Sequence, residues 1–198
     1  VSTRSHRQSW VDLSSYDNSG YDPGRSRLIR TVWYLISLIV FESGWCPLIR
    51  VKVLLLRMFG ARIGRCVVIK PNVRIKYPWR FEAGDHCWIG QEVWIDNLAN
   101  AVLGSNVCLS QRVYICTGGH DYRRRTFDLT ALPVEISDGV WVGACSLIHG
   151  GNNVGSNALV AAGSVVISDV PAEAIMGGVP ARVIRMRRPP EPVNDKPF

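Results

Sequence analysis

His120 is the side chain of this sequence best placed to move a proton. It stands in the segment Thr117-Gly-Gly-His-Asp-Tyr, at the start of an extra stretch of about fifteen residues, 121–135. The two glycines leave room for a ligand to approach, and the extra stretch predicts a loop that could cover it. Because an imidazole accepts and returns protons near neutral pH, this position suits a general base.

Metal binding is the competing use of the histidines. His86, His120 and His149 take different places in the six-residue repeat of the chain, so they do not converge, and no acidic or cysteine partner completes a ligand set. We therefore expect no metal. The six cysteines also take different places and include no Cys-x-x-Cys, which predicts free thiols in a reducing cytoplasm.

The elements that must position His120 follow a strict repeat of six residues. Each repeat has an aliphatic residue at its first place and a small one at its fifth, as in Val142-Gly-Ala-Cys-Ser-Leu. Helices space apolar residues by three and four and strands by two, so a period of six fits neither. It predicts a short strand followed by a corner, three of which close a triangular coil. The first places are Ile63, Ile69, Ile75, Ala83, Ile89, Ile95, Leu103, Leu109, Ile115, Ile136, Val142, Ile148, Val154, Val160 and Val166.

Fifteen repeats predict a mainly β fold, a parallel β-helix of about five coils over 61–171 with the loop 121–135 inserted. The first-place side chains should form ladders inside a stack with a spacing of about 4.8 Å. Glycine at the second place, as at Gly143, suits a tight corner. Residues 1–60 form an N-terminal arm and helical region, and residues 172–198 form a C-terminal extension.

Residues 25–41 and 48–59 predict two helices. The uncharged run 31–41 has eleven residues, short of the ~20 that cross a bilayer. We interpret the first helix as packed against the rest of the protein, with an interfacial membrane helix as the alternative. The net charge of +7 lies mostly on the flanks of the repeats. The chain lacks a basic stripe interleaved with aromatic residues, which argues against nucleic-acid binding, whereas an anionic membrane face or a phosphorylated substrate would be attracted.

Five segments outside the plain repeats carry a family resemblance: Trp10-Val-Asp-Leu-Ser, Leu55-Leu-Arg-Met-Phe-Gly-Ala-Arg-Ile-Gly, Ile75-Lys-Tyr-Pro-Trp, Cys116-Thr-Gly-Gly-His-Asp-Tyr and Gly178-Val-Pro-Ala-Arg-Val-Ile-Arg. With the six-residue repeats, they resemble the hexapeptide-repeat acyltransferases, and more narrowly the sugar O-acetyltransferases of the colanic acid biosynthesis group. The resemblance covers nearly the whole chain and implies a left-handed β-helix.

The resemblance implies transfer of an acetyl group from acetyl-CoA, as co-substrate, to a sugar hydroxyl of a polysaccharide, glycan or glycan precursor, with His120 as general base. It also implies a cytoplasmic homotrimer in which His120 of one subunit faces coenzyme contacts of the next, and we expect the 121–135 loop to reach that neighbour. Peripheral contact with the inner membrane face stays open. The positions that match the coenzyme contacts of the family are Trp141, Ala144, Ala162, Gly163, Ile167, Ser168, Arg182 and Arg185.

Two positions depart from the family pattern. Ile167-Ser168 stands where sugar acetyltransferases often carry Thr-Lys near the coenzyme, so coenzyme affinity should rest more on the arginines. Gly90 stands where the galactoside enzymes use an asparagine for the acceptor, so the identity of the acceptor does not carry over. We expect either Asp121 or Asp96 to orient the imidazole. A catalytically silent scaffold and a zinc carbonic anhydrase, which shares the hexapeptide fold, are the alternative functions. The residues expected at the acceptor are Asp96, Asn97, Asp121 and Tyr122.

Overall fold

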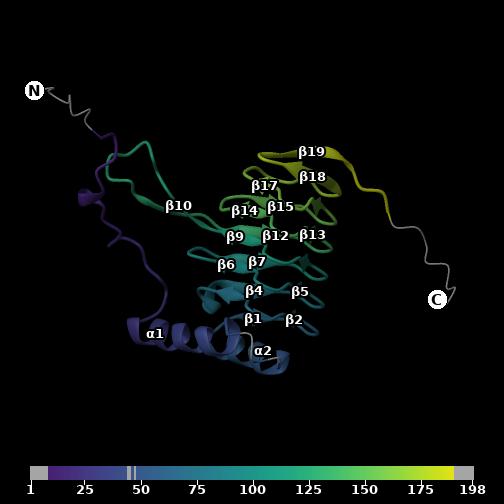
Figure 1. Cartoon of the computed structure of the whole chain (residues 1–198), viewed down its shortest axis with the longest axis horizontal. Coiled ribbons are helices and arrows are strands. Elements are labelled where there is room, and N and C mark those ends of the chain that lie inside the picture. Colours follow the sequence, from purple (N-terminus) through teal and green to yellow (C-terminus); the bar gives the residue numbers. More distant parts are fainter. Residues whose placement is uncertain (1–8, 44–45, 47, 190–198) are drawn as a thin grey trace, which may run out of the picture.

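A stack of triangular coils with two helices across its base makes up most of the chain (Figure 1). The computed structural model describes residues 9–43, 46 and 48–189. Each coil gives one short strand to each of three parallel sheets, which we call faces A, B and C. Face A contains β1 (Arg62–Ile63), β4 (Phe81–Ala83), β7 (Ala101–Leu103), β12 (Val134–Ile136) and β15 (Asn153–Val154). Face B contains β2 (Val68–Ile69), β5 (Trp88–Ile89), β8 (Cys108–Leu109), β13 (Trp141–Val142), β16 (Leu159–Val160), β18 (Ala174–Gly178) and β19 (Ala181–Met186). Face C contains β3 (Arg74–Ile75), β6 (Trp94–Asp96), β9 (Tyr114–Cys116), β14 (Leu147–His149) and β17 (Val165–Val166).

The core is the predicted set of ladders. On face C, Ile75 pairs with Ile95, and Ile95 pairs with Ile115 in the next coil. All fifteen first-place residues are buried, none more than 7% exposed. A first-place side chain therefore contacts its counterparts in the coils above and below, which is where the apolar burial of this fold comes from. The predicted parallel β-helix is confirmed.

The corners differ from the sequence expectation in one respect. The left-handed backbone falls at the fourth place of the repeat, as at Asn72 (φ 59°) and Cys145 (φ 59°). The second-place glycines serve a different need. A Cβ on Gly143 would lie 2.5 Å from the backbone nitrogen of Ala162 in the next coil. Glycine is required there because two backbones approach closely, not because the corner needs a positive φ.

The stack has about six turns rather than five. Val170 bridges to Val154, and β18 adds a sixth parallel strand to face B. Val170, Ala174 and Met176 continue the buried interior although they do not follow a clean six-residue repeat. Strand β19 then folds back antiparallel on β18. The stack thus runs beyond residue 171, the boundary predicted from the repeat.

Two helices close the base of the stack. α1 (Arg27–Ile36) continues as a π-helical turn, Ser37–Phe41, and α2 is Ile49–Met58, close to the predicted ranges. Trp33 of α1 is buried, packs against Phe41 and Phe59, and donates its indole N–H to the carbonyl of Ile75 at 2.9 Å. The expectation of a packed helix holds only for this side, because the other side of α1 is exposed. Neither described helix is long and apolar enough to cross a membrane.

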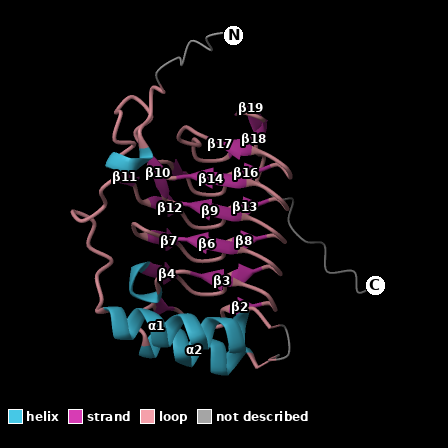
Figure 2. Ribbon diagram, turned by 60° about the vertical axis from the view of Figure 1, so that its left-hand side comes forward, coloured by secondary structure: helices cyan, strands magenta, loops and turns pink. Residues whose placement is uncertain are grey.

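All insertions into the repeat leave the stack at one corner, where face C turns into face A. Two short additions there precede β4 and β7. The long one forms a hairpin of β10 (Gly118–His120) and β11 (Leu129–Ala131), so part of the predicted loop is antiparallel strand. The hairpin stands away from the coils beside the N-terminal arm, residues 9–24 (Figure 2).

Candidate active site

The His120 imidazole is held by the far end of its own hairpin. Its Nδ1 lies 2.9 Å from the carbonyl oxygen of Phe127, and the two rings stack at 4.3 Å with an interplanar angle of 7°. Phe127 adopts a left-handed backbone (φ 52°) at this turn. A carbonyl oxygen only accepts hydrogen bonds, so Nδ1 must carry the proton and donate. In the neutral imidazole Nε2 is then the nitrogen without a proton, as a general base requires.

The N-terminal arm supplies a second contact to this ring. Tyr16 meets His120 edge-on at 5.7 Å between ring centroids. The backbone N–H of Asp12 donates to the carbonyl of Arg125 at 2.8 Å, and the side chains of this pair form an ion pair at 3.6 Å. The 121–135 loop, which we expected to reach a neighbouring subunit, thus contacts the arm of its own chain.

Asp121 is engaged within the loop rather than with the imidazole. Its carboxylate pairs with Arg123 at 2.9 Å and lies 3.9 Å from Arg124. The hydrogen bond from the Arg123 side chain lowers the pKa of Asp121, so it stays a carboxylate. We expected Asp121 or Asp96 to orient the imidazole, whereas in the structure the carbonyl of Phe127 contacts its Nδ1. Tyr122 lies beside them with its side chain exposed to solvent.

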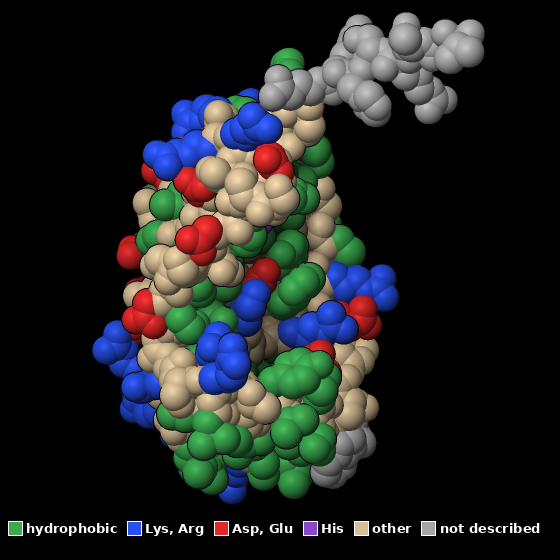
Figure 3. Space-filling view, turned by 90° about the vertical axis from the view of Figure 1, so that its left-hand side faces the viewer, with side chains coloured by type: hydrophobic (Ala, Val, Ile, Leu, Met, Phe, Trp, Pro, Cys, Tyr) green, Lys and Arg blue, Asp and Glu red, His purple; other side chains and the backbone are tan. Residues whose placement is uncertain are grey.

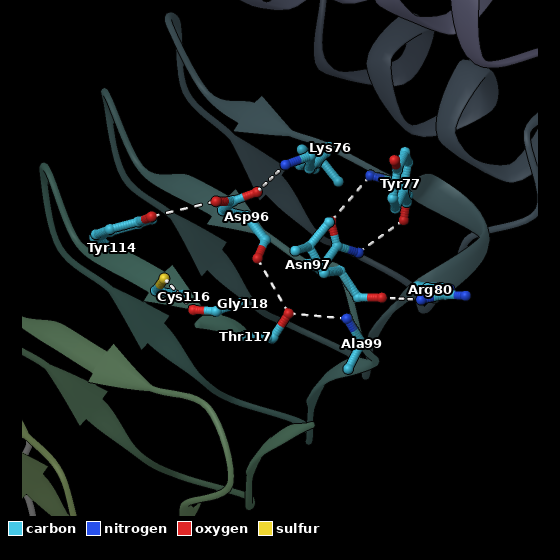
Figure 4. Close-up of polar contacts among 12 residues, drawn as sticks. Lys76, Tyr77, Arg80, Asp96, Asn97, Ala99, Tyr114, Cys116, Thr117 and Gly118 are labelled. Atoms are coloured by element: carbon cyan, nitrogen blue, oxygen red, sulfur yellow. Dashed lines mark hydrogen bonds and ion pairs between the residues drawn. The ribbon is translucent and has the colours of Figure 1, made fainter. Parts of the chain in front are cut away.

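Asp96 and Asn97 are neighbours in sequence but have different roles (Figure 4). The carboxylate of Asp96 forms an ion pair with Lys76 at 2.8 Å and accepts from the Tyr114 hydroxyl at 3.3 Å. Burial raises the pKa of Tyr114, so its hydroxyl stays protonated and can donate. The Asn97 amide accepts from the Tyr77 N–H at 2.9 Å and donates to the Tyr77 carbonyl at 2.7 Å. Because its side chain is fully buried, Asn97 cannot touch an acceptor, and that expectation is corrected.

A pocket of about 340 Å³ lies between α1 and face C. Asp96 and Lys76 line it from the stack, beside the exposed ring of Trp94, and Arg30 and Tyr34 line it from α1. The Trp94 ring stacks on Tyr114 at 4.6 Å. A lining of apolar and aromatic side chains with a few charged groups is typical of small-ligand sites. Of the four residues expected at the acceptor, Asp96 is the one that lines this pocket.

The residues expected at the coenzyme fall into four groups. Ala144, Ala162 and Gly163 share the corner between faces B and C, where the Gly163 N–H donates to the Ala144 carbonyl at 2.8 Å. Trp141 lies on face B, 47% exposed, with its indole N–H on the Ser110 hydroxyl at 2.9 Å.

The other two groups lie elsewhere on the stack. Ile167 and Ser168 follow β17 at the end of face C from which the His120 hairpin leaves two coils below. Arg182 and Arg185 are exposed on β19. Within one chain, the full width of face C separates His120 from the corner that carries Ala144, Ala162 and Gly163.

The other histidines have local explanations. His86 occupies a left-handed corner position (φ 57°), and Nδ1 of His149 contacts the Gly150 carbonyl at 3.0 Å. Among the described residues, no three His, Cys, Asp or Glu side chains are arranged to hold a metal ion.

The sequence patterns did not point to Tyr16 or Lys76, and they did not pair Phe127 with His120. Phe127 acts through its carbonyl, which every residue type carries, so no residue pattern could have revealed it. Tyr16 precedes its partner by 104 positions and Lys76 precedes Asp96 by one coil. Lys76 and Asp96 occupy equivalent places in successive coils, so the repeat itself could have paired them.

Comparison with known proteins identifies relatives across the chain. No family model matches it. It is 35% identical over 179 residues, 89% of this chain and 97% of the relative, to "Putative colanic acid biosynthesis acetyltransferase WcaF" of Escherichia coli (strain K12). It is 29% identical to the galactoside O-acetyltransferase of Escherichia coli, over 66% of each chain.

Solved structures agree with this result. The hexapeptide-repeat acetyltransferase VCA0836 of Vibrio cholerae, complexed with acetyl coenzyme A, superposes with a TM-score of 0.75 and 27% identity, covering 85% of this chain and 93% of that one. Identity and coverage with the colanic acid relative are high enough to decide the family. The chain is an acetyltransferase of the hexapeptide-repeat, left-handed β-helix family, in the group that contains the colanic acid biosynthesis proteins.

Proposed function

We propose that this enzyme transfers an acetyl group from acetyl-CoA to a hydroxyl of a sugar in a polysaccharide, glycan or glycan precursor, with His120 as general base. The observation that carries the proposal is the hydrogen bond from Nδ1 to the Phe127 carbonyl, which leaves Nε2 free. Nε2 takes the hydroxyl proton as the sugar oxygen attacks the thioester carbonyl. The C–S bond then breaks, and the imidazolium returns the proton to the departing thiolate.

The acceptor is proposed to lie in the pocket between α1 and face C, with Asp96 accepting hydrogen bonds from its hydroxyls. Cys116 is the neighbour of Asp96 in register and precedes His120 by four residues. An extended chain of that length places the Cα of His120 at most about 13 Å from the Cα of Cys116. An acceptor of several sugar rings could therefore occupy the pocket and still present a hydroxyl to His120. Asp121 and Tyr122 are proposed to contact its outer part.

The enzyme is proposed to act as a homotrimer. The reason is the separation of His120 from Ala144, Ala162 and Gly163 by one face of the prism, which a second copy would bridge by bringing that corner to His120. Trp141, Ile167, Ser168, Arg182 and Arg185 complete the proposed coenzyme contacts. We also propose that the enzyme is cytoplasmic and contacts the inner membrane face peripherally. The apolar residues that α1 and α2 expose support the membrane contact.

The activity is tested by measuring free thiol released from acetyl-CoA in the presence of a panel of sugars and oligosaccharides, with mass spectrometry to detect the acetylated product. Thiol release that depends on one acceptor supports the proposal. A folded protein that binds the coenzyme but acetylates none of the panel contradicts it and favours a silent scaffold.

The shared site is tested by mixing two inactive variants, His120→Ala and Ala162→Trp, which adds bulk at an exposed coenzyme position. In a trimer with a shared site, random mixing leaves roughly a quarter of the interfaces with both residues intact, so activity returns. Light scattering should give about 66 kDa, three times 22.0 kDa. An active monomer, or no recovery on mixing, contradicts the shared site.

A further inference from the structure

The two helices at the base of the stack carry nearly half of the exposed large apolar side chains of the described chain. Eleven large apolar side chains on or next to α1 and α2 are solvent-exposed, Leu28 at 73% and Met58 at 70% among them. On the face shown in Figure 3, hydrophobic side chains gather at the lower end of the molecule. The eleven are Leu28, Ile29, Val32, Tyr34, Leu35, Leu38, Ile39, Leu48, Val51, Leu54 and Met58, and we call them the base patch. Soluble proteins rarely expose a contiguous apolar patch of this kind unless it binds something.

The base patch is ordered by helix periodicity. On α1 and its π-helical turn, Leu28, Val32, Leu35 and Ile39 follow spacings of four, three and four, which forms one outward stripe. The inward stripe of α1 is separate and already fulfils the structural role of the helix, since Trp33 is buried against the first coil. The outward stripe is therefore not needed to close the stack, and its apolar character requires another explanation.

The charges around the base patch favour an anionic partner. Residues 25–60 contain six Arg or Lys and one acidic residue, Glu42. Glu42 is neutralised by an ion pair with Arg74 at 3.1 Å. Arg25, Arg27 and Arg50 are exposed. A second copy of this surface would bring like charges together, whereas the anionic headgroups of a bilayer would attract them while the apolar side chains enter the headgroup boundary.

We infer that the base patch docks the enzyme on the surface of a membrane that contains anionic lipids. α1 and its π-helical turn have fifteen residues and run across the base of the stack, so they would lie flat in the interface and not span it (Figure 1). The stack would then stand upright on the membrane. His120 leaves the third coil, about 20 Å above the surface if one helix diameter and two coil spacings are added.

If the proposed function holds, the height of His120 above the membrane limits which membrane-anchored acceptors can reach it. An acceptor anchored in the same bilayer must present its sugars at about this distance from the lipid to reach Nε2 of His120. The pocket between α1 and face C lies on the path from the base patch to the hairpin, because α1 contributes to both.

Vesicle flotation with the full chain tests the inference. We expect the protein to float with phosphatidylcholine vesicles that contain phosphatidylglycerol, and less with phosphatidylcholine alone or at high salt. Leu35→Gln/Leu54→Gln removes one exposed leucine from each helix and should lower the partition coefficient at least ~10-fold. Arg27→Gln/Arg50→Gln should lower it about fivefold for each arginine, with anionic vesicles only. Leu13→Gln is the matched control: Leu13 is 66% exposed in the arm, outside the base patch, and its substitution should leave partitioning unchanged.

Three results would overturn the inference. The first is no flotation of the wild-type chain at low salt, and the second is flotation of Leu35→Gln/Leu54→Gln equal to that of the wild type. The third is a smaller mass for this double variant than for the wild type, measured by light scattering without vesicles. The last would show that the base patch is a contact between copies of this chain. Thiol release with a soluble acceptor is measured in parallel and should be unchanged in Leu35→Gln/Leu54→Gln. If the wild type floats but shows no transfer, the docking stands and the proposed function fails.

Discussion

Two corners of the same prism differ in how they are built. The corner between faces B and C repeats in five coils with a left-handed residue at the fourth place of each repeat: Asn72, Glu92, Arg112, Cys145 and Gly163. The corner between faces C and A follows no such rule. It holds the 3₁₀ turn Pro78–Arg80, a second short addition and the His120 hairpin. Some of its backbone groups are satisfied by the buried side chains of Asn97, Thr117 and Asn152.

The difference explains which corner of this fold accepts insertions. At the regular corner each coil bonds to the next through backbone groups, so an added residue would break the register of every coil above it. At the irregular corner buried side chains add to the backbone bonds, such as the one from the Gly150 N–H to the Cys116 carbonyl at 2.7 Å, so the chain can leave the stack there and return in phase. His120, Asp96 and the proposed acceptor pocket all lie on this side, while the regular corner carries the proposed coenzyme contacts Ala144, Ala162 and Gly163.

The largest expected effect is on catalysis at the irregular corner. His120→Ala should lower kcat by about 10²–10⁴-fold, because Nε2 is the proposed base. The side chain is exposed, so the thermal midpoint should change little. His86→Asn is the matched control: it removes a histidine at a regular corner, and asparagine tolerates the left-handed backbone there. Near-normal turnover in His120→Ala would exclude the general-base role.

The second effect distinguishes the structural role of Asn97 from the proposed acceptor-binding role of Asp96. Asn97→Ala leaves the N–H and the carbonyl of Tyr77 without their partner in a buried place, which should cost about 2–4 kcal/mol of unfolding free energy in urea. Asp96→Asn keeps the shape and should mainly raise the KM for the acceptor. If Asn97→Ala were as stable as wild type but had a higher acceptor KM, the structural role of Asn97 would be wrong.

These residues also show how far the sequence could be read. The six-residue period placed every first-place residue in the core, because burial on a period of six has few geometric solutions. The prediction that Asn97 contacts the acceptor was wrong, because the sequence around an asparagine is the same whether its amide bonds to a neighbouring coil or to a ligand. It also could not find Phe127, whose carbonyl orients His120. Backbone groups and contacts across the arm depend on folded geometry that residue identity does not encode.

A smaller effect tests the regular corner. A Cβ at Gly143 would lie 2.5 Å from the Ala162 nitrogen, so Gly143→Ala should cost about 1–3 kcal/mol of stability. Gly163 has φ +70° but nothing within 4 Å of its Cβ position, so Gly163→Asn should cost about 1 kcal/mol or less. Thermal melts of the pair compare the two constraints. If Gly163→Asn were the more destabilised, conformation rather than coil spacing would limit this corner.

The smallest expected effect concerns the tether between the arm and the hairpin. The side chains of Asp12 and Arg125 are solvent-exposed, so their ion pair is screened by water and contributes little to stability. Asp12→Asn removes the charge but keeps a residue that caps the 3₁₀ turn Leu13–Ser15 equally well. The melting temperature should hardly move. Activity should fall a few-fold, because a looser arm positions Tyr16 less firmly against the imidazole, and the loss should disappear at high salt, where the wild-type pair is screened as well. Arg123→Gln is the control, since Arg123 pairs with Asp121 within the loop and not with the arm. If both variants lost activity equally, loop charge in general would matter and the arm would have no specific part in holding His120.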